Sequence, residues 1–180
     1  MDQQIVLIPL VCVRCSTPVP AMSDEAAWVC ANCGQAMSLD EEHGLIPQFV
    51  YYSAAIPPNG IGKPFWVAEG QVVLKRTSYG SDKGQQEEAR RFWSQPRHFF
   101  IPAYQATLEQ LLSQGIQFLL NPPPLQEGPA ARFAPAVLDL RDVKSAAEFL
   151  VVAVEAGRPD KLKELAFDLK LNPPVLWILP

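Results

Sequence analysis

The sequence predicts an α+β protein in which a small N-terminal β module precedes a larger domain of mixed strands and helices. Two observations indicate this arrangement. Two Cys-x-x-Cys pairs near the N-terminus are flanked by strand and turn signals, and after Gly44 segments rich in β-branched and aromatic residues alternate with amphipathic segments. The chain has 180 residues, of which 48% are hydrophobic and 19% charged, a composition typical of a folded protein with a sizeable core. We therefore expect a module at residues 1–44 and an α+β domain at residues 45–180.

All four cysteines of the chain lie in the N-terminal module, as the pairs Cys12-x-x-Cys15 and Cys30-x-x-Cys33. Four thiolates complete a tetrahedral zinc site, and a two-residue spacer lets a tight turn aim both sulfurs of a pair at one ion. We expect strands at Ile5–Leu10 and Ala27–Val29, before the two pairs. Gly34 follows the last cysteine, where a left-handed turn is often needed.

Each Cys-x-x-Cys pair with its tight turn is called a knuckle. With two such knuckles, the segment from Ile5 to Leu39 resembles the zinc ribbon, a family of small β-hairpin modules. The resemblance implies one Zn²⁺ per chain with the ligands Cys12, Cys15, Cys30 and Cys33. It does not specify a function, because zinc ribbons serve in transcription, translation, nucleic-acid binding and scaffolding.

Other uses of the four thiols fit the sequence less well than a zinc site does. A rubredoxin-like iron site uses the same ligands, but its knuckles lie much further apart in sequence. A thioredoxin-like redox pair needs a Cys-x-x-Cys at the start of a helix, and two structural disulfides are unusual in a reducing cytoplasm. A zinc deaminase needs a His-x-Glu motif, whereas His43 is followed by Gly44 and Leu45. Zinc is favoured over iron, disulfides and redox chemistry.

Charge argues against nucleic-acid binding by the N-terminal module. Residues 1–59 contain Arg14 as their one basic residue against six carboxylates, a net charge of −5, and phosphate binding draws mostly on Lys and Arg. Residues 60–98 instead hold seven basic and four acidic residues, with aromatic residues interleaved. The alternative to a protein-binding role is therefore a nucleic-acid patch within residues 63–97, formed by Arg76, Arg90, Arg91 and Arg97.

The larger domain is expected to contain a series of short elements. The predicted strands are Gln48–Ala54, Pro64–Leu74, His98–Ile101, Ile116–Leu120, Phe167–Leu171 and Val175–Leu179. The predicted helices are Gln85–Ser94, Tyr104–Gln114 closed by Gly115, and a nearly apolar helix that begins with the capping box Ser145-x-x-Glu148, ends at Glu155 and belongs in the core. Thr77–Gly84 is expected to be a polar loop. Two short motifs recur loosely, which suggests an internal repeat of residues 98–124 in 132–175.

The sequence offers no recognisable catalytic constellation. His43 and His98 are expected to be surface or turn residues, and Asp139 and Asp142 strand-end or helix-start residues. The N-terminus reads neither as a signal peptide nor as a membrane span. We expect a cytoplasmic zinc-binding adaptor or structural subunit of a larger protein assembly, with protein partners favoured over nucleic acid and with a non-enzymatic role favoured over catalysis.

Overall fold

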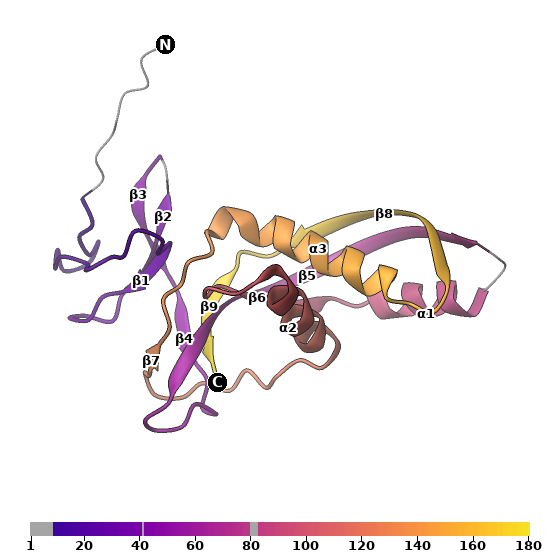
Figure 1. Ribbon diagram of the computed structural model, residues 1–180. Coiled ribbons are helices and arrows are strands. Elements are labelled where there is room, and N and C mark those ends of the chain that lie inside the picture. Colours follow the sequence, from indigo (N-terminus) through magenta and orange to yellow (C-terminus); the bar gives the residue numbers. More distant parts are fainter. Residues whose placement is uncertain (1–8, 41, 80–82) are drawn as a thin grey trace, which may run out of the picture.

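The computed structural model describes residues 9–40, 42–79 and 83–180, which form two β-sheets and three α-helices within those ranges (Figure 1). The small sheet is antiparallel and has the strand order β1-β2-β3. Its strands are β1 (Ala27–Val29), β2 (Ala36–Asp40) and β3 (Gly44–Gln48). The prediction of an α+β fold with an N-terminal β element is confirmed. The predicted strand Ile5–Leu10 lies mostly outside the described residues.

The large sheet is built around β5, a strand of 19 residues. Its core order is β4-β9-β5-β6, and β7 and β8 also pair with β5. Along one edge of β5, β9 pairs with residues 63–67 and β8 with residues 70–79. The strands are β4 (Val50–Tyr52), β5 (Ile61–Tyr79), β6 (Arg97–Pro102), β7 (Arg132–Phe133), β8 (Lys161–Leu171) and β9 (Val175–Leu179). The predicted strands of the large sheet are thus found, except Ile116–Leu120.

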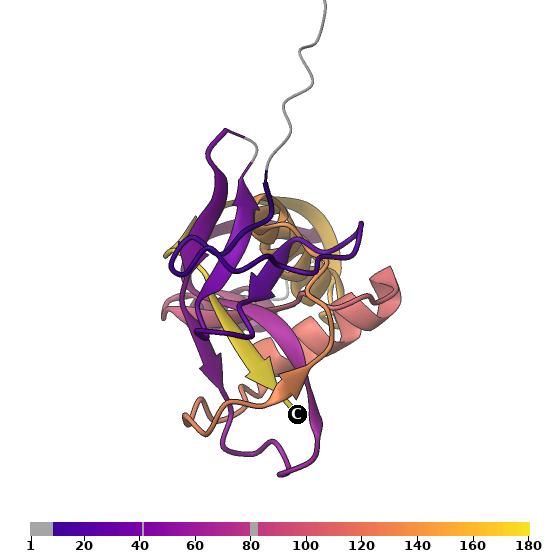
Figure 2. The same cartoon turned by 90° about the vertical axis from the view of Figure 1, so that its left-hand side faces the viewer.

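The main core lies between the large sheet and the helices α2 (Leu108–Leu120) and α3 (Val143–Ala156). A second apolar cluster covers the opposite sheet face, around Phe65, Phe100 and Trp177. The remaining helix, α1 (Lys83–Trp93), packs beside β5 and ends with Trp93 fully buried. Figure 1 places the small sheet at one end of the molecule and α1 at the other, and Figure 2 shows the molecule from the side of the small sheet.

The structure corrects the prediction for α2. The helix begins at Leu108, because Thr107 and Gln110 form a reciprocal capping box, and it continues to Leu120. The predicted strand Ile116–Leu120 is therefore helical. Gly115 does not end the helix: a Cβ there would lie 2.7 Å from the Leu150 side chain, so this glycine lets α2 approach α3 closely.

Helix α3 is found where a helix was predicted, but it begins at Val143, two residues before the predicted start at Ser145. The N-cap residue is Asp142, which makes no side-chain capping bond. It is also the last residue of a 3₁₀ turn (Leu140–Asp142) that leads directly into the helix. Ser145 lies inside the first turn and is not a cap. The helix ends at Ala156, one residue beyond the predicted end at Glu155, and Gly157 is its C-cap. One side of α3 is buried, but Phe149 is 59% exposed, so this apolar helix is only partly a core element.

A buried polar cluster fastens α1 and α3 to the far end of the large sheet. Glu155 of α3 is fully buried and accepts a hydrogen bond from Trp93 Nε1 at 2.8 Å. Arg76 of β5 forms a bidentate pair with Asp160 at 2.8 and 2.9 Å, and its Nε lies 2.9 Å from Glu155 Oε2 without hydrogen-bond alignment. Arg158 donates to Glu155 Oε1 at 2.8 Å.

Two predictions about organisation stay open. Strand β3 belongs to the small sheet and runs from Gly44 to Gln48. The division of the chain into two domains at residue 44 remains a prediction. The recurring Leu-Asn-Pro-Pro motif follows helix α2 at Leu120 and ends strand β8 at Leu171. The internal repeat likewise remains a prediction.

Candidate metal centre

The first cysteine pair lies in a loop before β1 that is closed by the bridge between Val11 and Pro18, and the second lies in the turn between β1 and β2. The two loops have the same backbone hydrogen bonds. In the first loop, Cys12 N–H donates to the Thr17 carbonyl and Ser16 N–H donates to the Cys12 carbonyl, both at 2.8 Å. In the second loop, Cys30 N–H donates to the Gln35 carbonyl at 2.9 Å and Gly34 N–H to the Cys30 carbonyl at 2.8 Å. The two Cys-x-x-Cys segments therefore form equivalent knuckles.

The fifth residue of each knuckle adopts a left-handed conformation. Gly34 has φ of 72°, as predicted, and Ser16 has φ of 57°. Ser16 is the one non-glycine residue with positive φ in the described part of the chain. Because this conformation costs an L-residue about 1–2 kcal/mol, the first knuckle carries backbone strain that the second avoids.

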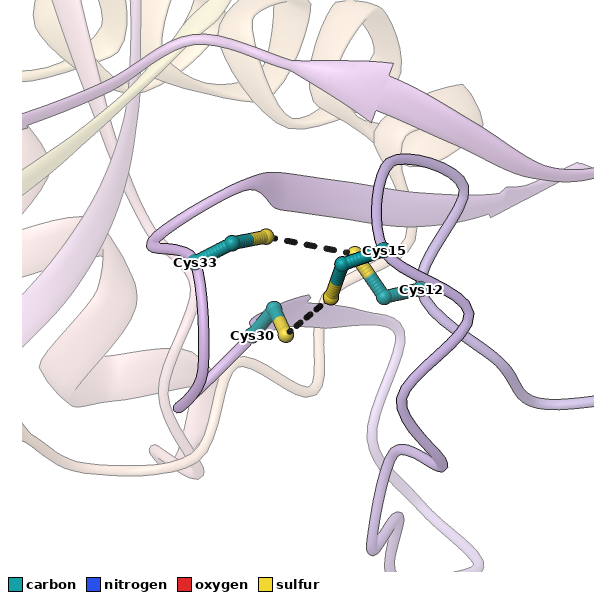
Figure 3. Close-up of side chains that lie close together, drawn as sticks. All are labelled: Cys12, Cys15, Cys30 and Cys33. Atoms are coloured by element: carbon teal, nitrogen blue, oxygen red, sulfur yellow. Dashed lines mark hydrogen bonds between the residues drawn. The ribbon is translucent and has the colours of Figure 1, made fainter.

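The four sulfur atoms form one compact cluster, in which all lie within 4.8 Å of one another (Figure 3). Cys12 Sγ lies 3.6 Å from Cys33 Sγ, and Cys15 Sγ lies 3.6 Å from Cys30 Sγ. Both close pairs join different knuckles. An ion with Zn–S bonds of about 2.3 Å separates its tetrahedral ligands by about 3.8 Å, so the donor set fits a four-thiolate metal site.

All four cysteines are free thiols. The separations of 3.6 Å are far longer than the bond of about 2.05 Å in a disulfide. The cluster could hold a metal ion, and its geometry suits zinc and iron alike, because both accept four thiolates in a tetrahedron.

Neighbouring donors polarise the sulfur atoms unequally. The Thr17 hydroxyl, 3.2 Å from Cys15 Sγ, is the largest influence that lowers the pKa of Cys15 to about 5, and the Asn32 side-chain amide adds to it from 3.6 Å. The pKa of Cys12 is also lowered: burial opposes the change, and the Arg14 amide at 3.4 Å favours it. These donors support thiolates, as ligands around a metal require.

The pKa of Cys33 is shifted in the opposite direction. The Gln35 backbone amide lowers the pKa of Cys33, but burial and hydrogen bonds with the other three thiols together raise it to about 12. Several negative charges cannot gather within this distance without a cation, so one thiol keeps its proton when another ionises. A divalent ion at the centre would remove that conflict.

A small apolar cluster encloses the knuckles. Cys12 is 1% exposed and Cys30 4%, and both pack with Trp28, Met37 and Leu45. Because protein thiols supply all four donors and two of them are buried, the site is closed in the way that structural metal sites are.

Strand β1 of the small sheet contacts the segment between β7 and α3. The Ala136 carbonyl accepts hydrogen bonds from the amides of Ala26 at 2.8 Å and Ala27 at 3.3 Å. A cavity of about 220 Å³ lies beside this contact, lined from both parts by residues that include Pro18, Trp28, Phe133 and Pro135. The Ala27 side chain belongs to the main core.

The structure separates the four arginines that the sequence suggested as a nucleic-acid patch. Arg76 is 8% exposed and paired with Glu155 and Asp160, so it is not available at the surface. Arg97 lies 3.9 Å from the Phe92 ring and donates two hydrogen bonds to the Phe92 carbonyl. Arg90 and Arg91 are exposed on α1. The exposed part of the suggested patch is therefore limited to α1 and the adjoining Arg97.

The histidines and aspartates considered as catalytic candidates make local contacts or lie on the surface. His43 is exposed and contacts Asp40 at 2.8 Å, and His98 is exposed on β6. Asp139 caps the 3₁₀ turn by accepting from Arg141 N–H at 2.8 Å. Asp142 precedes α3, as the sequence suggested.

Two residues that support the cluster were not identified from sequence. Thr17 and Asn32 hydrogen-bond each other at 3.2 Å and both contact Cys15, which links the two knuckles. Their roles depend on how the loops face each other, and no spacing rule signals that.

Comparisons of the chain with protein-family models, curated proteins and solved structures give no match. In the described residues, no helix is long and apolar enough to cross a membrane.

Proposed function

We propose that the four cysteines bind one zinc ion as a structural clip, and that the chain is an adaptor or structural subunit of a larger cytoplasmic protein assembly. The observation that carries the metal assignment is the closed four-sulfur cluster, with every sulfur within 4.8 Å of the others. A catalytic zinc keeps a coordination position for water or substrate, and four protein thiolates fill a tetrahedron. Zinc is favoured over iron by the short spacing between the knuckles.

The protein-binding role is supported by charge and by exposed apolar residues. The chain has a net charge of −4, with −5 in residues 1–59, which disfavours a polyanionic partner at long range. Phe49, Met22 and Phe149 are 72%, 67% and 59% exposed, respectively. Scattered apolar side chains are ordinary, but aromatic and methionine side chains are also enriched at protein interfaces.

Two experiments test the proposal. Elemental analysis of protein purified without added metal should give about one zinc per chain, and stoichiometric iron or two disulfides would contradict the metal assignment. Affinity purification from the native host with nuclease treatment should retain stoichiometric protein partners. Loss of all partners after nuclease treatment would overturn the adaptor role.

Nucleic-acid binding is the second candidate, favoured by the exposed Arg90 and Arg91 on α1. It demands binding that weakens steeply with salt, and each phosphate contact removed should flatten the slope of log affinity against log salt by about 0.7–0.9. Titration of labelled single- and double-stranded oligonucleotides decides this. Micromolar binding at physiological salt that is lost in an Arg90→Ala, Arg91→Ala double variant would replace the adaptor role with this one.

A further inference from the structure

Two hollows flank one stripe of α1. Figure 1 shows α1 at the end of the molecule away from the small sheet. The stripe consists of Gln85, Glu88 and Phe92, which line both hollows. Their spacing places them along one face of the helix. A ligand lying across this stripe would contact both hollows.

The first hollow, of about 410 Å³, is apolar and lies between α1 and the C-terminal ends of α2 and α3; we call it the apolar hollow. Its wall includes Ile116 and Leu120 from α2 and Val154 from α3. Leu120 is 47% exposed although the neighbouring Leu119 is 1% exposed and part of the core. The apolar hollow is therefore an open extension of the core surface.

The second hollow, of about 710 Å³, is basic and includes Arg91, Gln95 and Arg97; we call it the basic hollow. Arg97 is held in place by stacking 3.9 Å from the Phe92 ring and by its two hydrogen bonds to the Phe92 carbonyl. Within the described residues, no carboxylate pairs with Arg91 or Arg97, and the lining carboxylate Glu88 lies 3.7 Å from Arg158. With two arginines and one carboxylate in its lining, the basic hollow has a net positive charge.

We propose that the two hollows together dock a peptide segment of a partner protein that carries an aliphatic or aromatic side chain close to a carboxylate. The apolar side chain fills the apolar hollow beside Leu120, and the carboxylate meets Arg91 and Arg97 across the α1 stripe. Charge complementarity selects an acidic segment, and the preordered Arg97 lowers the entropy lost on binding. This inference rests on the proposed adaptor function, since it takes the partner to be a protein.

A nucleic acid fits these hollows less well. Single strands bind through aromatic platforms and long basic grooves, whereas the apolar hollow is largely aliphatic and the basic hollow has two arginines. One face of its aromatic residue, Phe92, is already covered by Arg97. The combination of an open aliphatic wall with two arginines, of which Arg97 is held by Phe92, suits an acidic peptide with an apolar anchor.

The test is selection of a random dodecapeptide phage library on the full zinc-loaded chain, followed by fluorescence-polarisation titration of the enriched peptides. Enriched peptides should pair an apolar residue with Asp or Glu. Leu120→Asp should weaken their binding about tenfold or more, because it places a charge in the anchor hollow. Arg91→Ala should weaken it about two- to fivefold, and raised salt should weaken it similarly.

Matched controls lie outside both hollows. Phe149→Asp changes an apolar residue of α3 that is 59% exposed, and Arg90→Ala changes the neighbouring arginine of α1 on another face; neither should alter peptide affinity. Absence of enriched peptides, or equal binding to Leu120→Asp at an unchanged melting temperature, would overturn the inference. Oligonucleotide binding that is lost in Arg91→Ala would overturn it in favour of the nucleic-acid candidate.

The same variants separate this inference from the proposed function. Partners that copurify equally with Leu120→Asp and with the unmodified chain would leave the adaptor role intact and refute the docking site. A chain that binds enriched peptides but retains no protein in the native host would refute the adaptor role alone.

Discussion

At the scale of single residues, the two knuckles differ mainly at their left-handed position. Ser16 and Gly34 have φ of 57° and 72° in otherwise equivalent hydrogen-bonded loops. Nothing lies within 4 Å of a Cβ built on Gly34, so a side chain there meets no steric obstacle. The cost of a substitution at Gly34 is therefore conformational.

Substitutions at these two positions should have opposite effects on zinc retention. Gly34→Ala should destabilise the zinc-bound small sheet by about 1 kcal/mol, which is the cost of the left-handed backbone minus the conformational entropy that alanine removes from the unfolded chain. Ser16→Gly should stabilise the zinc-bound small sheet by up to about 1 kcal/mol, for the opposite reason. Competition with a chromophoric chelator measures both changes as shifts in zinc affinity. Equal effects of the same sign would show that the knuckles are not equivalent.

The protonation of the thiols should make metal binding depend on pH. Zinc binds thiolates, so every thiol still protonated in the metal-free protein must release its proton. With a pKa of about 12, Cys33 should release one proton per zinc throughout pH 6–8, whereas Cys15, with a pKa of about 5, should release almost none. Affinity should therefore fall at least about tenfold for each unit by which the pH is lowered in that range.

Calorimetric titration of the metal-free protein with zinc checks this directly. Repeating the titration in buffers with different ionisation enthalpies counts the released protons. Affinity that does not change between pH 6 and 8 would contradict the thiol assignment.

At the scale of secondary-structure elements, sequence succeeded where the cause is local. The strand β1 and the turn at Gly34 were predicted because short-range pattern and left-handed geometry determine them. Gly115 was wrongly predicted to end a helix. A glycine is needed there because the Leu150 side chain, which is distant in sequence, leaves no room for a Cβ atom. Arg76 was misread as a surface cation because its partners, Glu155 and Asp160, come from the last third of the chain. Such tertiary contacts leave no periodic signal.

The buried cluster around Glu155 gives a prediction at this scale. Glu155→Ala leaves Trp93 Nε1 without its acceptor and removes one carboxylate from between Arg76 and Arg158, so it should lower the free energy of unfolding by about 3–5 kcal/mol. Glu155→Gln keeps an acceptor for Trp93 and should cost less. Urea unfolding followed by far-UV circular dichroism measures both.

Glu148→Ala is the control, since Glu148 lies on the same helix in a partly exposed pair with Lys144 at 3.9 Å. A pair of that kind contributes about 0–1 kcal/mol. If Glu155→Ala cost no more than this control, the buried cluster would not fasten α1 and α3 to the sheet.

At the scale of the whole molecule, the metal cluster and the main core belong to two separate apolar clusters that meet at β1. The knuckles pack with Trp28, Met37 and Leu45 in one cluster, and α2, α3 and the large sheet enclose another. Between them, the Ala136 carbonyl accepts from the amides of Ala26 and Ala27. The docking hollows lie at the far end, so zinc loss should not reach them directly.

Zinc removal should therefore unfold the small sheet and leave the larger domain cooperative. Structural zinc contributes about 10–16 kcal/mol of apparent binding free energy in isolated finger peptides, and most of it should hold the small sheet here. Cys30→Ser should abolish stoichiometric zinc binding and expose Trp28, while the thermal transition of the large sheet persists at a moderately lower temperature because the Ala27 contact with the main core is lost. Far-UV circular dichroism and tryptophan fluorescence during thermal unfolding check this, with Met22→Ser, an exposed site in the same module, as the control. Loss of all cooperative unfolding in Cys30→Ser would show instead that the two sheets fold as one unit, with the hydrogen bonds at Ala136 transmitting the metal's stabilisation across the whole chain.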